Sequence, residues 1–201
     1  MARYYTNPEI VTLKGAAAHE VAVGPIHAGV IEPGHFRFQC LGEKVYDLKI
    51  HLGYQHRGVE DEIVKAYNAG KLGRCAALVE TCAGDTSIAA SLCWHAISSA
   101  GEPHLGSLPL SGRPSNANLR SDSIAENCME QGNRTASINA WRGELTHEAK
   151  FDENGKMLEY HIYDPSARNW YGLARALRGE SIYNFPICNK SFNLSYCGTD
   201  R

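Results

Sequence analysis

The sequence lacks the features that mark secreted, metal-cluster and membrane-spanning proteins. Its seven cysteines are an odd number at irregular spacings, and no two of them form a C-x-x-C pair. We therefore expect no disulfide framework and no ordinary zinc or iron–sulfur loop, but reduced and mostly buried thiols. No segment has the length and apolar character of a membrane span, and the first ten residues show no signal-peptide core. These absences predict a cytoplasmic protein.

A clustered basic stripe and an internal repeat are also missing. With 20 Lys and Arg against 22 Asp and Glu, the formal net charge is −2, which gives no electrostatic reason to expect nucleic acid binding. The 201 residues are 43% hydrophobic and 21% charged, a composition typical of a soluble globular protein. We expect one domain over residues 1–201 with a buried core.

The first half of the chain predicts a hairpin and then helices. Residues 35–41 and 44–51 are rich in β-formers and meet at Gly42-Glu43, and residues 59–69 carry apolar side chains at helical spacing before Gly70. The apolar stretch 74–99 predicts two helices, the second beginning at Ser87 after a break at residues 82–86.

The second half predicts a connector, a short helix and another hairpin. Residues 101–118 contain three prolines and read as an irregular connector, whereas residues 122–131 predict a short helix. Residues 141–151 and 157–163 form a hairpin around Asn154-Gly155, and a further helix starts at Asp164-Pro165-Ser166. Two hairpins separated by helices predict an α+β fold in which one antiparallel sheet, made by both hairpins, packs on helices.

Two imidazoles and a carboxylate gather on the loop before the first hairpin. His27, Glu32 and His35 lie around the turn residues Pro33-Gly34. Imidazole and carboxylate exchange protons near neutral pH, so this loop is a candidate for proton relay or ligand binding. The alternative is that these side chains only decorate a turn, because no nucleophile motif accompanies them.

Two stretches of the N-terminal half carry a resemblance to a known family. Residues 24–36, GPIHAGVIEPGHF, and residues 52–60, LGYQHRGVE, resemble the large subunit of energy-converting, membrane-associated nickel–iron hydrogenases. They also resemble its relative, the corresponding component of respiratory NADH:quinone oxidoreductase. Later stretches resemble the C-terminal part of the same family, at residues 141–144, 164–166 with 169–170, and 185–186 with 189–196. The connector at 101–118 replaces most of the family's central helical bundle, which implies a reduced bundle.

The family's metal ligands are not matched. Its hydrogenases hold nickel and iron with four thiolates from two C-x-x-C motifs, because soft thiolates suit these metals. The resemblance places the four ligand positions on residues that are not cysteines, namely Ala83, Thr86, Ser195 and Gly198. Cys82 and Cys197 fall one residue out of register. The resemblance therefore implies that the chain holds no nickel–iron centre and does no metal catalysis of its own.

Two residues of the opening loop remain as candidate catalytic residues. Glu32 resembles the carboxylate that passes protons toward the metal in hydrogenases, and His27 resembles a histidine of the quinone-facing hairpin in the respiratory relative. The resemblance implies no directly bound cofactor, iron–sulfur clusters in partner subunits, and a quinone as a further candidate ligand.

The function implied is that of a subunit in a hydrogenase-related or NADH:quinone oxidoreductase-like electron-transfer complex. Its partners would be an iron–sulfur small subunit and membrane subunits, which would hold the chain on the inner face of the cell membrane. The alternative is a structural or assembly protein that keeps the fold as a docking surface and catalyses nothing.

Overall fold

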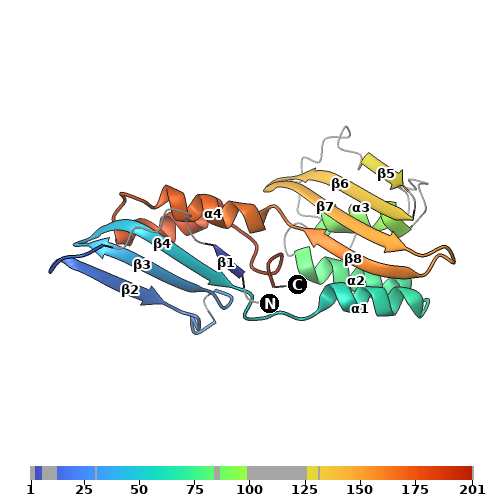
Figure 1. Cartoon of the computed structure of the whole chain (residues 1–201), viewed down its shortest axis with the longest axis horizontal. Coiled ribbons are helices and arrows are strands. Elements are labelled where there is room, and N and C mark those ends of the chain that lie inside the picture. The colour runs from blue at the N-terminus through green and yellow to red at the C-terminus, as the bar shows by residue number, and fades with distance from the viewer. Residues whose placement is uncertain are drawn as a thin grey trace. The chain divides into compact units, whose positions relative to one another are not determined.

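The computed structural model describes residues 3–5, 13–29, 31–83, 87–98, 126–130 and 132–200. Contacts within the chain divide it into two compact units (Figure 1). Unit 1 joins Met1–Arg57 to Asp164–Arg201, and unit 2 is the stretch Gly58–Tyr163. The prediction of one domain over residues 1–201 stays a prediction, and the connector at 101–118 lies outside the described residues.

Unit 1 contains a four-stranded antiparallel sheet in the order β1-β4-β3-β2. Its strands are β1 (Arg3–Tyr5), β2 (Ala18–Val23), β3 (His35–Leu41) and β4 (Lys44–Leu52). The predicted first hairpin is confirmed as β3 and β4, with Gly42 at a φ of 59° in the turn. Strand β2 pairs with β3 along its whole length and was not predicted.

Helices cover one face of this sheet. They are α4 (Ser166–Ala176), the 3-10 turn η2 (Ile182–Asn184) and α5 (Phe185–Phe192). The ring of Phe36 lies 6.4 Å from Trp170 of α4 and 5.0 Å from Phe185 of α5, measured between centroids. Alternate residues of β3, such as Phe36, Phe38 and Cys40, are fully buried in this core. The predicted helix after Asp164 is therefore confirmed as α4, whereas α5 was not predicted.

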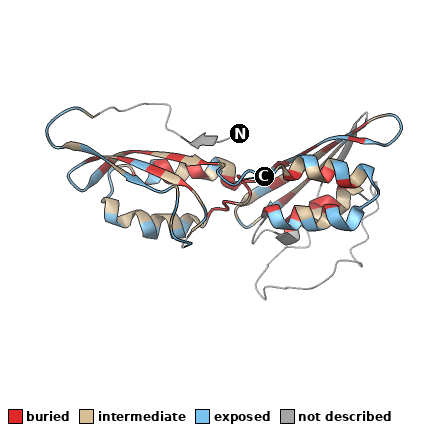
Figure 2. Cartoon of the chain, turned by 90° about the horizontal axis from the view of Figure 1, so that it is seen from below, coloured by how far each residue is buried: buried red, intermediate tan, exposed pale blue. Residues whose placement is uncertain are grey.

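Unit 2 contains a second four-stranded antiparallel sheet, in the order β5-β6-β7-β8, packed against three helices (Figure 1). Its strands are β5 (Glu126–Glu130), β6 (Asn133–Ala140), β7 (Gly143–Phe151) and β8 (Met157–Tyr163). Its helices are α1 (Val59–Asn68), α2 (Leu72–Ala83) and α3 (Ser87–Ser98). The second hairpin and all three helices agree with prediction. In each unit the buried residues lie between sheet and helices (Figure 2).

Two predictions of the fold were wrong. The short helix predicted at residues 122–131 is contradicted by β5, which pairs with β6 from Glu126↔Ser137 to Glu130↔Asn133. The α+β class is confirmed, but the two hairpins lie in two separate sheets rather than in one. The physical reason is the same in both cases, because pairing with a neighbouring strand overrides weak local propensity.

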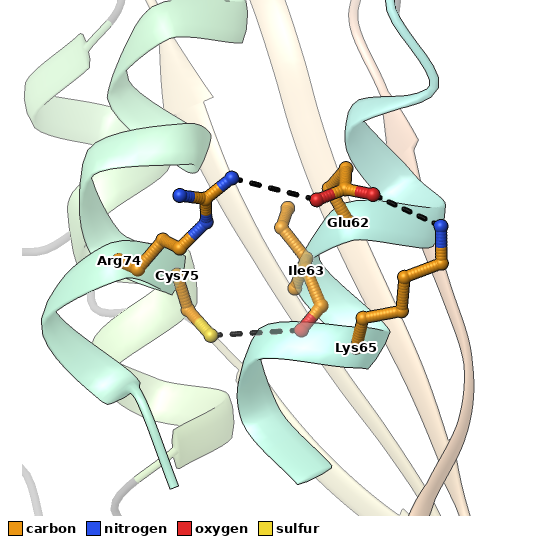
Figure 3. Close-up of polar contacts among 5 residues, drawn as sticks. All are labelled: Glu62, Ile63, Lys65, Arg74 and Cys75. Carbon is orange, nitrogen blue, oxygen red and sulfur yellow. Dashed lines mark hydrogen bonds and ion pairs between the residues drawn. The ribbon is translucent and has the colours of Figure 1, made fainter. Parts of the chain in front are cut away.

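Polar contacts tie α1 to its surroundings inside unit 2. The Asn68 side chain donates to Met157 O at 2.8 Å and accepts from Met157 N at 2.9 Å, which holds the end of α1 against strand β8. On the exposed side, Glu62 accepts from both Lys65 and Arg74, linking α1 to α2 (Figure 3). Among the helices that the structure describes, none has the length and apolar character needed to cross a membrane.

Candidate functional site

His27 closes the loop that precedes β3. Its Nε2 lies 2.6 Å from the carbonyl oxygen of Gly34, and its ring stands 6.0 Å from that of Phe36. The backbone supports the same closure, since Gly34 N donates to Pro25 O at 3.2 Å. Gly24, at a φ of 91°, has no room for a Cβ beside Gly34 O. The half-buried imidazole therefore uses one ring nitrogen to shape the loop.

Glu32 lies on the exposed part of this loop. Its charge raises the pKa values of Tyr196, Cys197 and Asp200, so its carboxylate acts on the C-terminal loop. The two residues selected from the sequence thus engage different groups. His27 binds within its own loop, and Glu32 joins a polar cluster.

We call this polar cluster, made of Glu32, Arg57, Cys197 and Asp200, the C-terminal cluster. Asp200 is only 2% exposed. Burial raises the pKa of its carboxyl group, and the Glu32 charge adds to that effect. Hydrogen bonds from the backbone N–H groups of Gly53 and Gln55, together with the Arg57 charge, act in the opposite direction. The Asp200 carboxylate is therefore fixed to the turn after β4.

One oxygen of this carboxylate, Oδ1, has no hydrogen-bond partner among the described residues. Sequence reasoning missed Asp200, because an aspartate two residues after a glycine near the end of a chain gives no signal of burial. Only the packing of the C-terminal loop against the turn at 53–55 shows it.

Cys197 contributes a protonated thiol. Burial raises its pKa, as does the Glu32 charge, while Arg57 lowers it. The neighbouring Tyr196 has its pKa raised to about 12 by burial, with the Asn189 hydrogen bond opposing and Glu32 contributing. A thiol and a phenol held in their neutral forms are poor metal ligands and poor nucleophiles at neutral pH.

Two histidines face each other on the sheet of unit 1. His35 of β3 and His51 of β4 are direct cross-strand partners, and Tyr54 Oη lies 3.1 Å from His51 Nδ1. Burial lowers the pKa of His51, and the charge of His35 lowers it further. This arrangement favours a neutral imidazole at His51.

The positions implied for metal ligands do not fit a thiolate site. Ser195 is buried, and its Oγ accepts from Gly198 N at 3.1 Å. The space beside Gly198 is filled by the Asp164 carboxyl group. Of the other two positions, Thr86 and the side chain of Ala83 lie outside the described residues. Within the described parts of the chain, no group of three or more His, Cys, Asp or Glu side chains is placed to hold a metal ion.

Comparison with known proteins gives short, partial matches. The chain is 41% identical over 44 residues to "Carbon monoxide-induced hydrogenase" of Rhodospirillum rubrum. It is 46% identical over 43 residues to "Hydrogenase-4 component G" and 48% identical over 40 residues to "Formate hydrogenlyase subunit 5", both of Escherichia coli (strain K12). No known protein-family profile matches the chain.

The matched stretches are a small part of either partner. They cover 22%, 21% and 20% of this chain and 12%, 8% and 7% of the respective relatives. Over about a fifth of its length, then, the chain is similar to subunits and components of hydrogenase enzymes.

Proposed function

We propose that this chain is a subunit of a hydrogenase-related, NADH:quinone oxidoreductase-like electron-transfer complex and holds no nickel–iron centre of its own. The observation that carries the proposal is the similarity to three hydrogenase proteins, two of which are named as a component or subunit of a larger enzyme. The geometry at Ser195 and Gly198 supports the proposed lack of a nickel–iron centre, because neither position offers a thiolate.

The proposed partners are an iron–sulfur small subunit and membrane subunits, which would place the chain on the inner face of the cell membrane. Iron–sulfur clusters would then belong to the partners, and a quinone is the small molecule that the respiratory branch of the family would add. The affinity-tagged chain, purified from membranes of cells that produce it naturally, should carry partner proteins and non-haem iron. Recovery as a stable, cluster-free monomer would contradict the proposal.

The lack of a metal of its own is tested separately. Elemental analysis of the purified chain should find no stoichiometric nickel, since Ser195 and Gly198 cannot supply two thiolates. One nickel per chain would overturn this part of the proposal. The result does not depend on whether partner subunits are found.

Within such a complex, Glu32 and His27 are the proposed carriers of remaining chemistry. Glu32 is exposed, and its charge acts on the titratable groups Cys197 and Asp200, which supports a role in proton exchange. His27 is tied to Gly34 O, which supports a role in shaping the loop around any ligand. In the purified complex, Glu32→Gln should slow electron transfer to an added quinone. Glu20→Gln, on strand β2 of the same unit and paired with Arg37, should leave the rate unchanged.

The second candidate function is a non-catalytic structural or assembly protein. The replacement of thiolate positions by Ser195 and Gly198 favours it, because a docking surface needs no metal. Pulse labelling separates the two functions. A complex subunit stays in the finished complex, whereas an assembly protein is bound to the precursor and absent from the finished form.

A further inference from the structure

No side chain can be added at Gly198 without displacing Asp164. A Cβ built on Gly198 would overlap Oδ2 and Cγ of Asp164, and it would lie 2.8 Å from Asp164 Cβ. Real Cβ atoms do not approach other heavy atoms so closely. Position 198 therefore has to remain glycine for a steric reason.

Asp164 cannot easily move aside to make this space. Its side chain is buried, and its Oδ1 accepts from Ser166 N at 2.7 Å at the start of α4. A buried carboxylate that swings away from such a donor leaves the backbone N–H without its partner, which is costly in a protein interior.

The loop around Gly198 is already closed by its own hydrogen bonds. Ser195 N donates to Ser166 Oγ at 3.0 Å, and Ser195 Oγ accepts from Gly198 N at 3.1 Å. Thr199 Oγ1 donates to Ser195 O at 3.4 Å. These contacts fix the conformation of the loop.

We infer that Asp164 blocks any thiolate pair at positions 195 and 198, because its carboxyl group fills the volume that a ligand side chain at position 198 requires. Cysteines introduced at positions 195 and 198 would then bind a soft metal ion only when Asp164 is also replaced by glycine. The choice of these two positions rests on the proposed function, whereas the steric conflict is a property of this chain alone.

Cadmium binding to the full chain tests the inference. The variant Ser195→Cys/Gly198→Cys is compared with the same variant carrying Asp164→Gly, and ultraviolet absorbance reports cadmium–thiolate bonds. Ser195→Cys alone is the control, since it pairs with the native Cys197 only. We expect Asp164→Gly to tighten cadmium binding by about tenfold or more. Equal binding with Asp164 in place, or no gain on its removal, would overturn the inference.

Stability measurements keep the test decisive if a cysteine variant does not fold. Gly198→Ala is introduced into the native chain and into the Asp164→Gly background, and unfolding midpoints are compared within each background. We expect Gly198→Ala to lower the unfolding midpoint clearly in the native chain and by less in the Asp164→Gly background. Equal falls would refute the steric role of Asp164. Neither experiment involves partner subunits, so failure to copurify with partners would leave both results standing.

Discussion

Tyr160 Oη lies 2.7 Å from His147 Nδ1, and both side chains are buried beneath the helices of unit 2. Their rings meet edge to face at a centroid distance of 5.7 Å. A polar pair of this kind is held in the core because each partner satisfies the other.

Removing the Tyr160 hydroxyl should destabilise unit 2. Tyr160→Phe leaves a nitrogen of a fully buried imidazole without its partner, which typically costs about 1–3 kcal/mol of unfolding free energy. Chemical denaturation followed by circular dichroism measures the loss. Tyr163→Phe is the matched control, because its hydroxyl contacts Glu148 on the exposed face and its removal should change stability by less than about 0.5 kcal/mol. Equal effects of the two variants would contradict the prediction.

Cys93 should make the protein sensitive to alkali. Burial raises the pKa of its thiol from 9.0 to about 12. The raised pKa favours the folded state fully below pH 9, and this contribution is lost as pH rises from about 9 to about 12. Over that interval the difference of 12 − 9 = 3 pH units corresponds to roughly 4 kcal/mol.

Denaturation at several pH values measures this contribution. Cys93→Ala should flatten the alkaline fall in unfolding free energy by up to about 1.4 kcal/mol per pH unit. Val79→Ala trims a non-titrating side chain of the same core and should lower stability at every pH without changing the slope. An unchanged slope for Cys93→Ala would show that another group governs alkaline unfolding.

Asn68 should stabilise the attachment of α1 to β8. Asn68→Ala removes the donor to Met157 O and the acceptor for Met157 N together, for an expected loss of about 2 kcal/mol. Asn68→Asp keeps the acceptor but sets a carboxylate against Met157 O, so its loss should shrink in acid, when the protonated group can donate. Glu62→Gln, which weakens only the exposed ion pairs of Figure 3, should have a far smaller effect. A loss for Asn68→Ala no larger than that of Glu62→Gln would contradict the prediction.

Asp200 should make unit 1 less stable as pH rises through the acid range. Its carboxyl pKa is raised above the ordinary 3.8, chiefly by burial. The folded state therefore holds the proton more tightly than the unfolded state, and this contribution is present below pH 3.8 and lost as pH rises above it. Asp200→Asn keeps an acceptor for the turn at 53–55 but does not ionise. The stability of the variant relative to the native chain should rise from pH 3 to pH 6, and a constant difference would contradict the prediction.

Local chemistry made much of the fold predictable. The Asn154-Gly155 turn and the alternation of buried and exposed residues in β3 can be predicted from the sequence. Each depends on residues only a few positions apart. Strand β5 was predicted as a helix, because its local propensity is weak and its strand conformation comes from pairing with the adjacent β6. Helix α5 was not predicted; it carries Pro186 in its first turn, where proline is well tolerated.

The candidate site, too, was predictable only in part. Sequence placed His27 and Glu32 on one loop, which is correct, but the bond from His27 to Gly34 O and the approach of Glu32 to the C-terminal loop depend on the folded backbone. Asp164 packs directly against Gly198, which lies 34 residues later in the chain. No sequence pattern near either residue predicts this contact. Contacts of this kind come from packing and are visible only in three dimensions.

The discontinuity of unit 1 has a consequence for how the protein matures on the ribosome. All of unit 2 lies in one uninterrupted stretch, whereas unit 1 needs strands made before that stretch and helices made after it. Unit 2 can therefore complete its core during synthesis, while β3 and β4 wait with one face uncovered until α4 emerges. A chaperone that shields apolar strands during translation would meet this nascent chain at the sheet of unit 1.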